Sequence, residues 1–274
     1  MTLLALVARG FHDASVMALF GSACLLVLLA GKVPELALEG SGLRRGRRAA
    51  SLLALVSTPA WAIGTPGTFS WLISTSNGQI LLARLVVLAA LAGTVWAGRL
   101  RVTGWLSGAA LVLTAATGHV AGASPQGFWF IGAANDGLHL LTAGYWIGGL
   151  CVLLAMLGSR PSAPRLSQAV SLFAEWGMIA VALLVMTGII NAAMTLLGSP
   201  GHDDPIYAGI LVLKIALALI MIALALSNHF RLLPHLAQSN MAARLRNRAG
   251  WELGLGIVVV GLAALLSLIP PTHQ

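Results

Sequence analysis

Charged side chains are scarce in this chain, and so are cysteines. Of its 274 residues, 9% are charged and 58% are hydrophobic, and the mean hydropathy is +0.90. That balance excludes an ordinary soluble domain and indicates a membrane protein. The two cysteines, Cys24 and Cys151, have no CxxC spacing, so the sequence indicates neither a disulfide framework nor a zinc ribbon.

Motifs of the common hydrolytic enzymes are also missing. The sequence contains no phosphate-binding glycine loop, no zincin motif and no nucleophile with an adjacent base. We therefore expect a protein that is not an enzyme.

Eight long apolar runs dominate what is present. A helix needs about 17 to 25 apolar residues to cross a bilayer, whereas the strands of a membrane barrel alternate polar and apolar residues over about 10 positions. The continuous runs therefore predict an all-α bundle of about eight transmembrane helices, forming one integral membrane domain over residues 1–274. We expect the first run to be retained and not cleaved as a signal peptide. The runs cover residues 3–31, 49–65, 78–99, 103–121, 134–157, 167–194, 206–231 and 250–270.

The basic residues predict which side of the membrane each loop faces. A net charge of +8 can indicate a nucleic-acid surface. Here, however, 13 of the 16 Lys and Arg residues follow the first, third, fifth and seventh runs. Basic groups on alternate loops are the positive-inside pattern, so these four loops are predicted to face the cytoplasm and both termini to face outward.

Several histidines gather on the predicted outer side. His12 begins the first run, His119 ends the fourth, and Asp136 and His139 begin the fifth. Imidazole is the commonest protein metal ligand, and ionisable groups in apolar segments are costly enough to be functional candidates. The sequence predicts an outer metal site formed by His119 and His139, with His12 and Asp136 assisting. The alternative is that each histidine lies in the headgroup region without a ligand.

The start of the fifth run concentrates these features. Asp136, His139 and Trp146 have spacings of three and seven residues and so share roughly one helical face. Asp136 would orient the His139 ring or join it as a ligand. Gly144 and Gly148 form a small-xxx-small step that lets another helix approach closely. Such an approach would bring His139 within reach of His119 or His12.

Two basic residues lie inside apolar runs, near their outer ends. Arg84 and Lys214 could snorkel outward, pair with Asp13 or Asp136, or gate a pathway. In the outer loop before the seventh run, residues 202–204 (His202, Asp203 and Asp204) form either a solvated loop or a group that collects cations electrostatically.

Candidates for an inner pathway lie nearer the cytoplasmic side. Glu175 and Glu252 could carry a cation or proton onward, although Glu252 could equally snorkel at its helix end. Cys24 and Cys151 each follow an outer histidine by twelve residues, about 18 Å along a helix. They would form a soft inner site at a common depth, or simply pack as small apolar residues.

Several segments together resemble a known family. They are FHDASVMALFG at 11–21, TGH at 117–119, DGLHLLTAGYWIGGL at 136–150, TGIINA at 187–192, LVLKIALALIMIALALSNHFRLLPHL at 211–236 and WELG at 251–254. In combination they resemble the CopD-like copper resistance and copper import membrane proteins. At His229 an arginine is more usual in that family.

The resemblance implies a multi-pass protein of a bacterial inner membrane that handles copper. It implies copper roles for His119 and His139, and less securely for His12, and a periplasmic copper-binding partner of the CopC type, which we expect to be a separate chain. Imidazole suits both Cu(I) and Cu(II). The leading hypothesis is therefore a copper permease that contacts lipid, binds no nucleic acid and accepts copper at its periplasmic face.

Two other hypotheses use the same residues. A b-type haem protein or quinone-linked redox protein would use His119 and His139 as axial ligands, with Trp129 or Trp146 bordering the porphyrin. A copper-delivery receptor or assembly factor would receive copper without moving it across the membrane.

Overall fold

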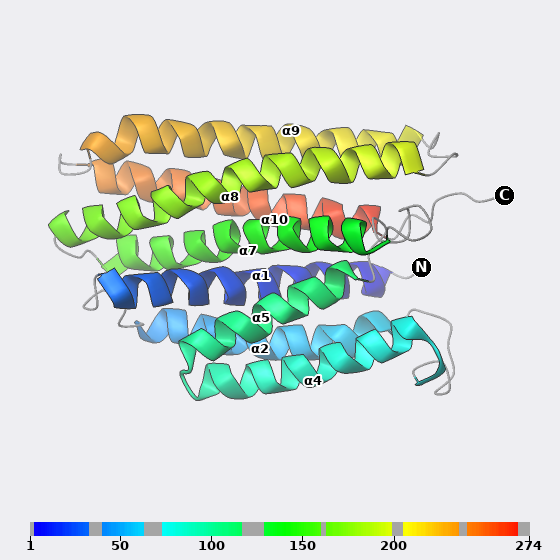
Figure 1. Ribbon diagram of the computed structural model, residues 1–274. Helices are drawn as coiled ribbons and strands as arrows, with labels where there is room; N and C mark the ends of the chain where they lie inside the picture. Colours follow the sequence, from blue (N-terminus) through cyan, green and yellow to red (C-terminus); the bar gives the residue numbers. More distant parts are fainter. Residues whose placement is uncertain are drawn as a thin grey trace.

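The computed structural model describes residues 3–32, 40–62, 73–116, 129–159, 163–198, 205–235 and 240–267. Within these ranges there is no strand, and eight α-helices of 16 to 36 residues form a bundle (Figure 1). Six of them are long and apolar enough to cross a membrane. These findings confirm the predicted all-α membrane bundle. The helices are α1 (Leu3–Lys32), α2 (Ser41–Ala62), α4 (Ser76–Trp96), α5 (Leu100–Ala115), α7 (Trp129–Ser159), α8 (Ala163–Gly198), α9 (Pro205–Ser227) and α10 (Met241–Leu266).

Each predicted run overlaps one helix, but two helices begin much earlier than their apolar runs. α2 begins at Ser41 and α10 at Met241, because the arginine-rich segments before the apolar residues are already helical. Arginine is a good helix former, so charge and helix are compatible there. The C-terminal end of α9 continues into a π-helical turn, η2 (Asn228–Leu232), which is followed by a 3-10 turn, η3 (Leu233–His235).

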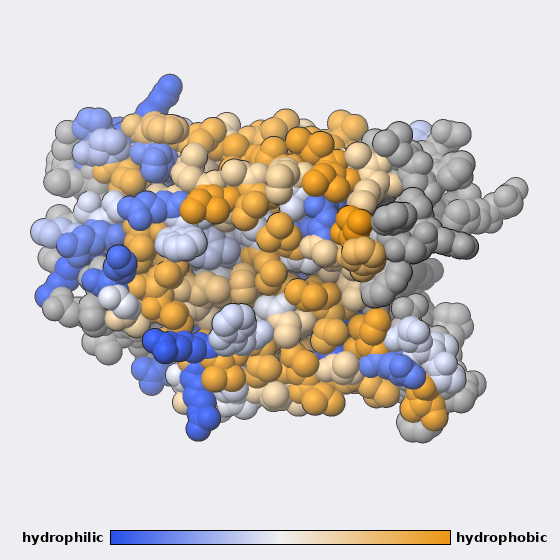
Figure 2. Space-filling view, viewed as in Figure 1, coloured by the Kyte–Doolittle hydropathy of each residue, from blue (hydrophilic) through white to orange (hydrophobic). Residues whose placement is uncertain are grey.

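Successive helices run in opposite directions, so α1 begins and α10 ends at the same end of the bundle (Figure 1). Hydrophilic residues gather at the opposite end, beyond a broad hydrophobic belt (Figure 2). There the Arg48 guanidinium from α2 lies 4.7 Å from the centre of the Trp96 ring, at the end of α4. We call this the basic end, after Lys32, Arg48, Arg99 and Arg248.

The backbones of α1 and α7 touch at the centre of the bundle. A Cβ added to Gly148 would lie 2.6 Å from Gly21 Cα, and one added to Gly21 would lie 2.9 Å from Gly148 Cα. Gly144 in turn packs against Phe20 and Leu111. The predicted small-residue step on α7 is therefore confirmed, and its partner is α1.

The bundle consists of two halves of four helices each, and the helices pack in the same arrangement in both halves. The first half comprises α1, α2, α4 and α5, and the second comprises α7, α8, α9 and α10. In each half the first helix packs on the second and fourth, and the third packs on the fourth; across the halves α5 packs on α7 and α10 on α1. His12 and His139, Gly21 and Gly148, and Cys24 and Cys151 all have the same offset of 127 residues. Because each half has four helices, both halves run in the same direction.

Candidate functional site

His139 lies on α7 and faces α8. Its Nδ1 is 3.0 Å from Thr187 Oγ1, and that hydroxyl donates its proton to Leu183 O at 2.7 Å. A hydroxyl has only one proton, so Thr187 accepts a hydrogen bond from His139 Nδ1–H. The ring therefore carries its lone pair on Nε2. A second ring N–H held by a fixed acceptor is the usual arrangement of a metal-binding histidine.

Asp136 lies one turn before His139, as the spacing predicted, but its partner is on α8. Asn191 Nδ2 donates to Asp136 Oδ1 at 3.0 Å, and Asn135 Nδ2 donates to Thr187 O at 3.0 Å and to Asn191 Oδ1. The orienting role that we predicted for Asp136 therefore belongs to Thr187. Three amide and carboxylate side chains fix the contact between α7 and α8 around His139.

Lys214 from α9 supplies the main positive charge in this region. It exerts the strongest electrostatic attraction on Asp136 and also acts on His139. The predicted pairing of Lys214 with Asp136 is therefore present as an electrostatic attraction between α9 and α7. A metal cation beside His139 would compete with Lys214 for the Asp136 carboxylate.

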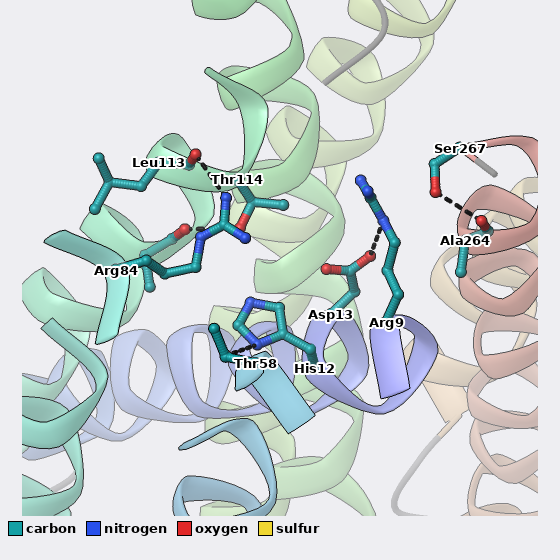
Figure 3. A network of polar contacts seen from close by, with 10 residues as sticks. Arg9, His12, Asp13, Thr58, Arg84, Leu113, Thr114, Ala264 and Ser267 are labelled. Atoms are coloured by element: carbon teal, nitrogen blue, oxygen red, sulfur yellow. Dashed lines mark hydrogen bonds and ion pairs between the residues drawn. The ribbon is translucent and has the colours of Figure 1, made fainter. Parts of the chain in front are cut away.

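His12 has the same kind of hydrogen bonding in the first half. Its Nδ1 is 3.0 Å from Thr58 Oγ1 and 3.3 Å from Ala54 O, and Thr58 Oγ1 donates to Ala54 O at 2.9 Å (Figure 3). Both neighbours of Nδ1 accept, so Nδ1 carries the proton and Nε2 the lone pair. His12 differs from His139 in being fully buried, with an exposed fraction of 0%.

Arg84 also belongs to the interior of the first half. Its exposed fraction is 1%, its Nη2 donates to Leu113 O at 2.9 Å, and its guanidinium lies next to the His12 ring (Figure 3). Asp13 attracts it and also forms an ion pair of 3.7 Å with Arg9. Arg84 is therefore buried and does not snorkel outward, and Asp13 attracts it electrostatically, while the pairing of the two residues stays a prediction.

The predicted metal ligands are only partly brought together. His12 faces α2 and His139 faces α8, so the two rings belong to different networks. Among the described residues no group of three or more His, Cys, Asp or Glu side chains could hold a metal ion. His119 and residues 202–204 lie outside the described residues, so their roles stay predictions.

The inner candidates differ in their exposure. Cys24 and Cys151 are free, partly buried thiols on corresponding turns of α1 and α7. Glu175 lies on the exposed surface of α8, whereas Glu252 is buried with an exposed fraction of 3%. The snorkelling alternative for Glu252 is therefore wrong, and it is Glu252 that places a carboxylate inside the bundle near the basic end.

Sequence reasoning missed the residues that hold the two histidines. Thr187, which holds His139, and Asn191, which holds Asp136, do carry a signal, because both belong to the TGIINA segment and lie four residues apart on one helical face. Thr58 has no comparable signal. Only the packing of α2 on α1 identifies it as the partner of His12.

The fold and site define a multi-pass, all-α membrane protein with a threonine-held histidine in each half. The family model described as copper resistance protein D matches residues 167–266, which lie in the second half. The chain is 31% identical to copper resistance protein D of Pseudomonas syringae pv. tomato over 258 residues, 81% of each chain. The chain therefore belongs to the copper resistance protein D (CopD) family.

Two further relatives extend the comparison. The inner membrane protein YebZ of Escherichia coli (strain K12) is 27% identical over 96% of this chain and 97% of its own length. The copper transport protein CutJ of Bacillus subtilis (strain 168) is 25% identical over 58% of this chain, but only 29% of its own length. No solved structure matches the chain.

Proposed function

We propose that this protein is a copper permease of a bacterial inner membrane and that copper first binds at His139, in the periplasmic half of the bundle. The observation that carries the proposal is the His139 ring, which Thr187 holds at Nδ1 so that Nε2 keeps its lone pair, one turn after the Asp136 carboxylate on α7. The printed names of two relatives, a copper resistance protein and a copper transport protein, support copper as the ligand.

The periplasmic assignment rests on charge and depth. The positive-inside rule places the basic end in the cytoplasm. α7 begins at the opposite end, and His139 lies ten residues after Trp129, about 15 Å along the helix. A copper ion released at the outer surface, for example by a periplasmic protein of the CopC type, would therefore reach His139 before the midplane of the bilayer.

His119 is the proposed second copper ligand, because it precedes α7 in the sequence and belongs to the same predicted outer group. Asp136 assists by balancing the charge of the ion, and residues 202–204 attract cations to this side. We leave His12 outside the proposed site, because its ring is fully buried and has no exposed surface through which an ion could reach it, whereas His139 is partly exposed.

Uptake of copper into proteoliposomes tests the proposal. We expect the double variant His119→Ala with His139→Ala to lose most of the flux that the wild-type protein supports. His235→Ala is the matched control, because His235 lies exposed at the basic end and bonds only its own turn, at Arg231 O. Equal flux through the wild type and the double variant would overturn the proposed function.

The same preparations separate the two competing functions. A stoichiometric Soret band that disappears in His139→Ala would establish a haem protein in place of a permease. Binding of copper by the wild type, with no flux above that of empty liposomes, would instead indicate a receptor or assembly factor.

A further inference from the structure

A second polar group surrounds a cavity near the basic end of the second half. The cavity has a volume of about 70 Å³ and lies between α7, α8, α10 and the turns that follow α9. Apolar side chains form most of its wall. The polar or sulfur-bearing side chains that line it are Trp146, Met178, Asn228, His229 and Glu252.

Glu252 brings a buried carboxylate to this cavity. Trp146 Nε1 donates to its Oε2 at 3.3 Å, and Asn228 Nδ2 donates to its Oε1. Arg248 Nη1 donates to Ser227 Oγ at 2.9 Å and to Asn228 Oδ1 at 3.4 Å, which turns the Asn228 amide toward the carboxylate. A carboxylate has about four lone-pair positions, so two donors leave Glu252 able to bind a cation as well.

His229 contributes an imidazole nitrogen that lacks a partner. His229 is one of the residues that line the cavity, and its Nδ1 is buried without a hydrogen bond to any of the described residues. Buried polar atoms nearly always have a partner, so an unsatisfied one beside a cavity indicates an occupant. His229 lies in the π-helical turn η2, and such turns frequently occur at functional sites.

The donor atoms fit a borderline or soft metal ion. The imidazole of His229, the carboxylate of Glu252 and the thioether of Met178 offer nitrogen, oxygen and sulfur, whereas magnesium and calcium prefer oxygen alone. A water molecule needs roughly 10 to 15 Å³ of such space. The cavity therefore has room for a metal ion together with water ligands.

We propose that this cavity is an inner copper site, in which His229 and Glu252 bind the ion and Met178 and water complete its coordination. The proposal rests on the proposed function, because it places the site on the route from His139 to the cytoplasm. Trp146 lies seven residues after His139 on the same face of α7, about 10 Å further inward, and borders the cavity. The two sites thus lie at successive depths beside α7.

Metal stoichiometry of the purified protein in detergent tests the inner site. The probe is Ag(I), a redox-inert substitute for Cu(I), measured by equilibrium dialysis and elemental analysis. We expect two equivalents for the wild type, and one for His229→Ala and for Glu252→Gln. His235→Ala is the control and should bind two equivalents. In case His229→Ala does not fold, His229→Arg introduces the residue more usual in the family and should also remove one equivalent.

The fluorescence of Trp146 gives a second, site-specific readout. The protein has eight tryptophans, so the Trp146 signal is the difference between the wild type and Trp146→Phe. Cu(II) bound in the cavity should quench this difference signal saturably, and His229→Arg should abolish that quenching. Wild-type stoichiometry and quenching in the His229 and Glu252 variants would overturn the inner site and leave the function at His139 intact. Conversely, loss of one equivalent in His229→Ala but none in the variant lacking His119 and His139 would support the inner site and refute the outer one.

Discussion

The two halves of the bundle hold a histidine in the same way and differ in what surrounds it. In the first half the basic neighbour, Arg84, is fully buried and bonded to Leu113 O, and His12 has no exposed surface. In the second half Lys214 and His139 are only partly buried, and two asparagines connect α7 with α8. The first half thus encloses its histidine completely, whereas the histidine of the second half keeps part of its surface exposed.

The contrast continues toward the basic end. There the first half pairs Thr94 with Thr103 across α4 and α5, at 3.2 Å between their hydroxyl oxygens. The second half instead pairs Asn228 with Glu252 beside a cavity. One helical arrangement therefore holds a pair of hydroxyl groups in one half and a buried carboxylate beside a cavity in the other. The family model, which matches residues 167–266, also lies in the second half.

Replacement of Arg84 and of Lys214 should give the largest difference in stability between the two halves. Arg84→Met would leave the Leu113 carbonyl without its donor and remove the attraction on Asp13, which we expect to lower the free energy of unfolding by about 3 to 5 kcal/mol. Lys214→Met should cost less, because it removes an electrostatic attraction on Asp136 and not a hydrogen bond of the kind that Arg84 donates to Leu113 O. Thermal unfolding in detergent measures both. Equal losses would show that the halves do not differ in this respect.

The contact between the halves can be tested at Gly148. Gly148→Val would place side-chain atoms against the α1 backbone, and we expect a loss of about 1 to 3 kcal/mol or more in stability. Gly158→Val is the matched control on the same helix, because nothing lies within 4 Å of a Cβ added there. If the two variants unfold at the same temperature, the close approach of α1 and α7 is not what holds the halves together.

The two threonines should separate a structural role from a role in binding. Thr187→Val removes the acceptor that orients His139, and we expect copper affinity to fall by about 10- to 100-fold. Thr58→Val removes the same bond from His12 and should lower stability by about 1 kcal/mol without changing affinity. Copper titration of both variants compares their affinities. A larger loss of affinity in Thr58→Val than in Thr187→Val would contradict the assignment of copper binding to His139.

The cysteines should show the smallest effect. They occupy equivalent positions in the two halves, and the inner site proposed here uses Glu252 and His229 in their place. We therefore expect the double variant Cys24→Ser with Cys151→Ser to take up copper at the wild-type rate in proteoliposomes. Loss of uptake would instead favour the soft inner site that the spacing of the two cysteines suggested.

The helices and their central contact could be predicted from sequence because each depends on local pattern. Apolar length determines a membrane helix, and the spacing of Gly144 and Gly148 places two small residues on one face. The partners of the histidines could not be predicted in the same way. Helical periodicity assigns His12 and His139 to faces of their own helices but does not say which neighbouring helix covers each face.

The burial of single polar residues could not be predicted from the sequence either. Glu175 and Glu252 both lie in long helices near the basic end, yet the first faces outward from α8 and the second is enclosed by Trp146 and Asn228. Only the packing of α10 against α7 and α9 separates them. Exposure of Lys214 and burial of Arg84 likewise depend on how closely the neighbouring helices pack around each side chain.

Copper uptake by two single-histidine variants tests most directly whether the second half carries the route. His139→Ala and His12→Ala would be reconstituted at equal amounts of folded protein and compared with the wild type. We predict that His139→Ala loses most of the uptake while His12→Ala retains it, with a lower unfolding temperature. Wild-type uptake through His139→Ala, together with loss of uptake in His12→Ala, would contradict the assignment of the route to the second half.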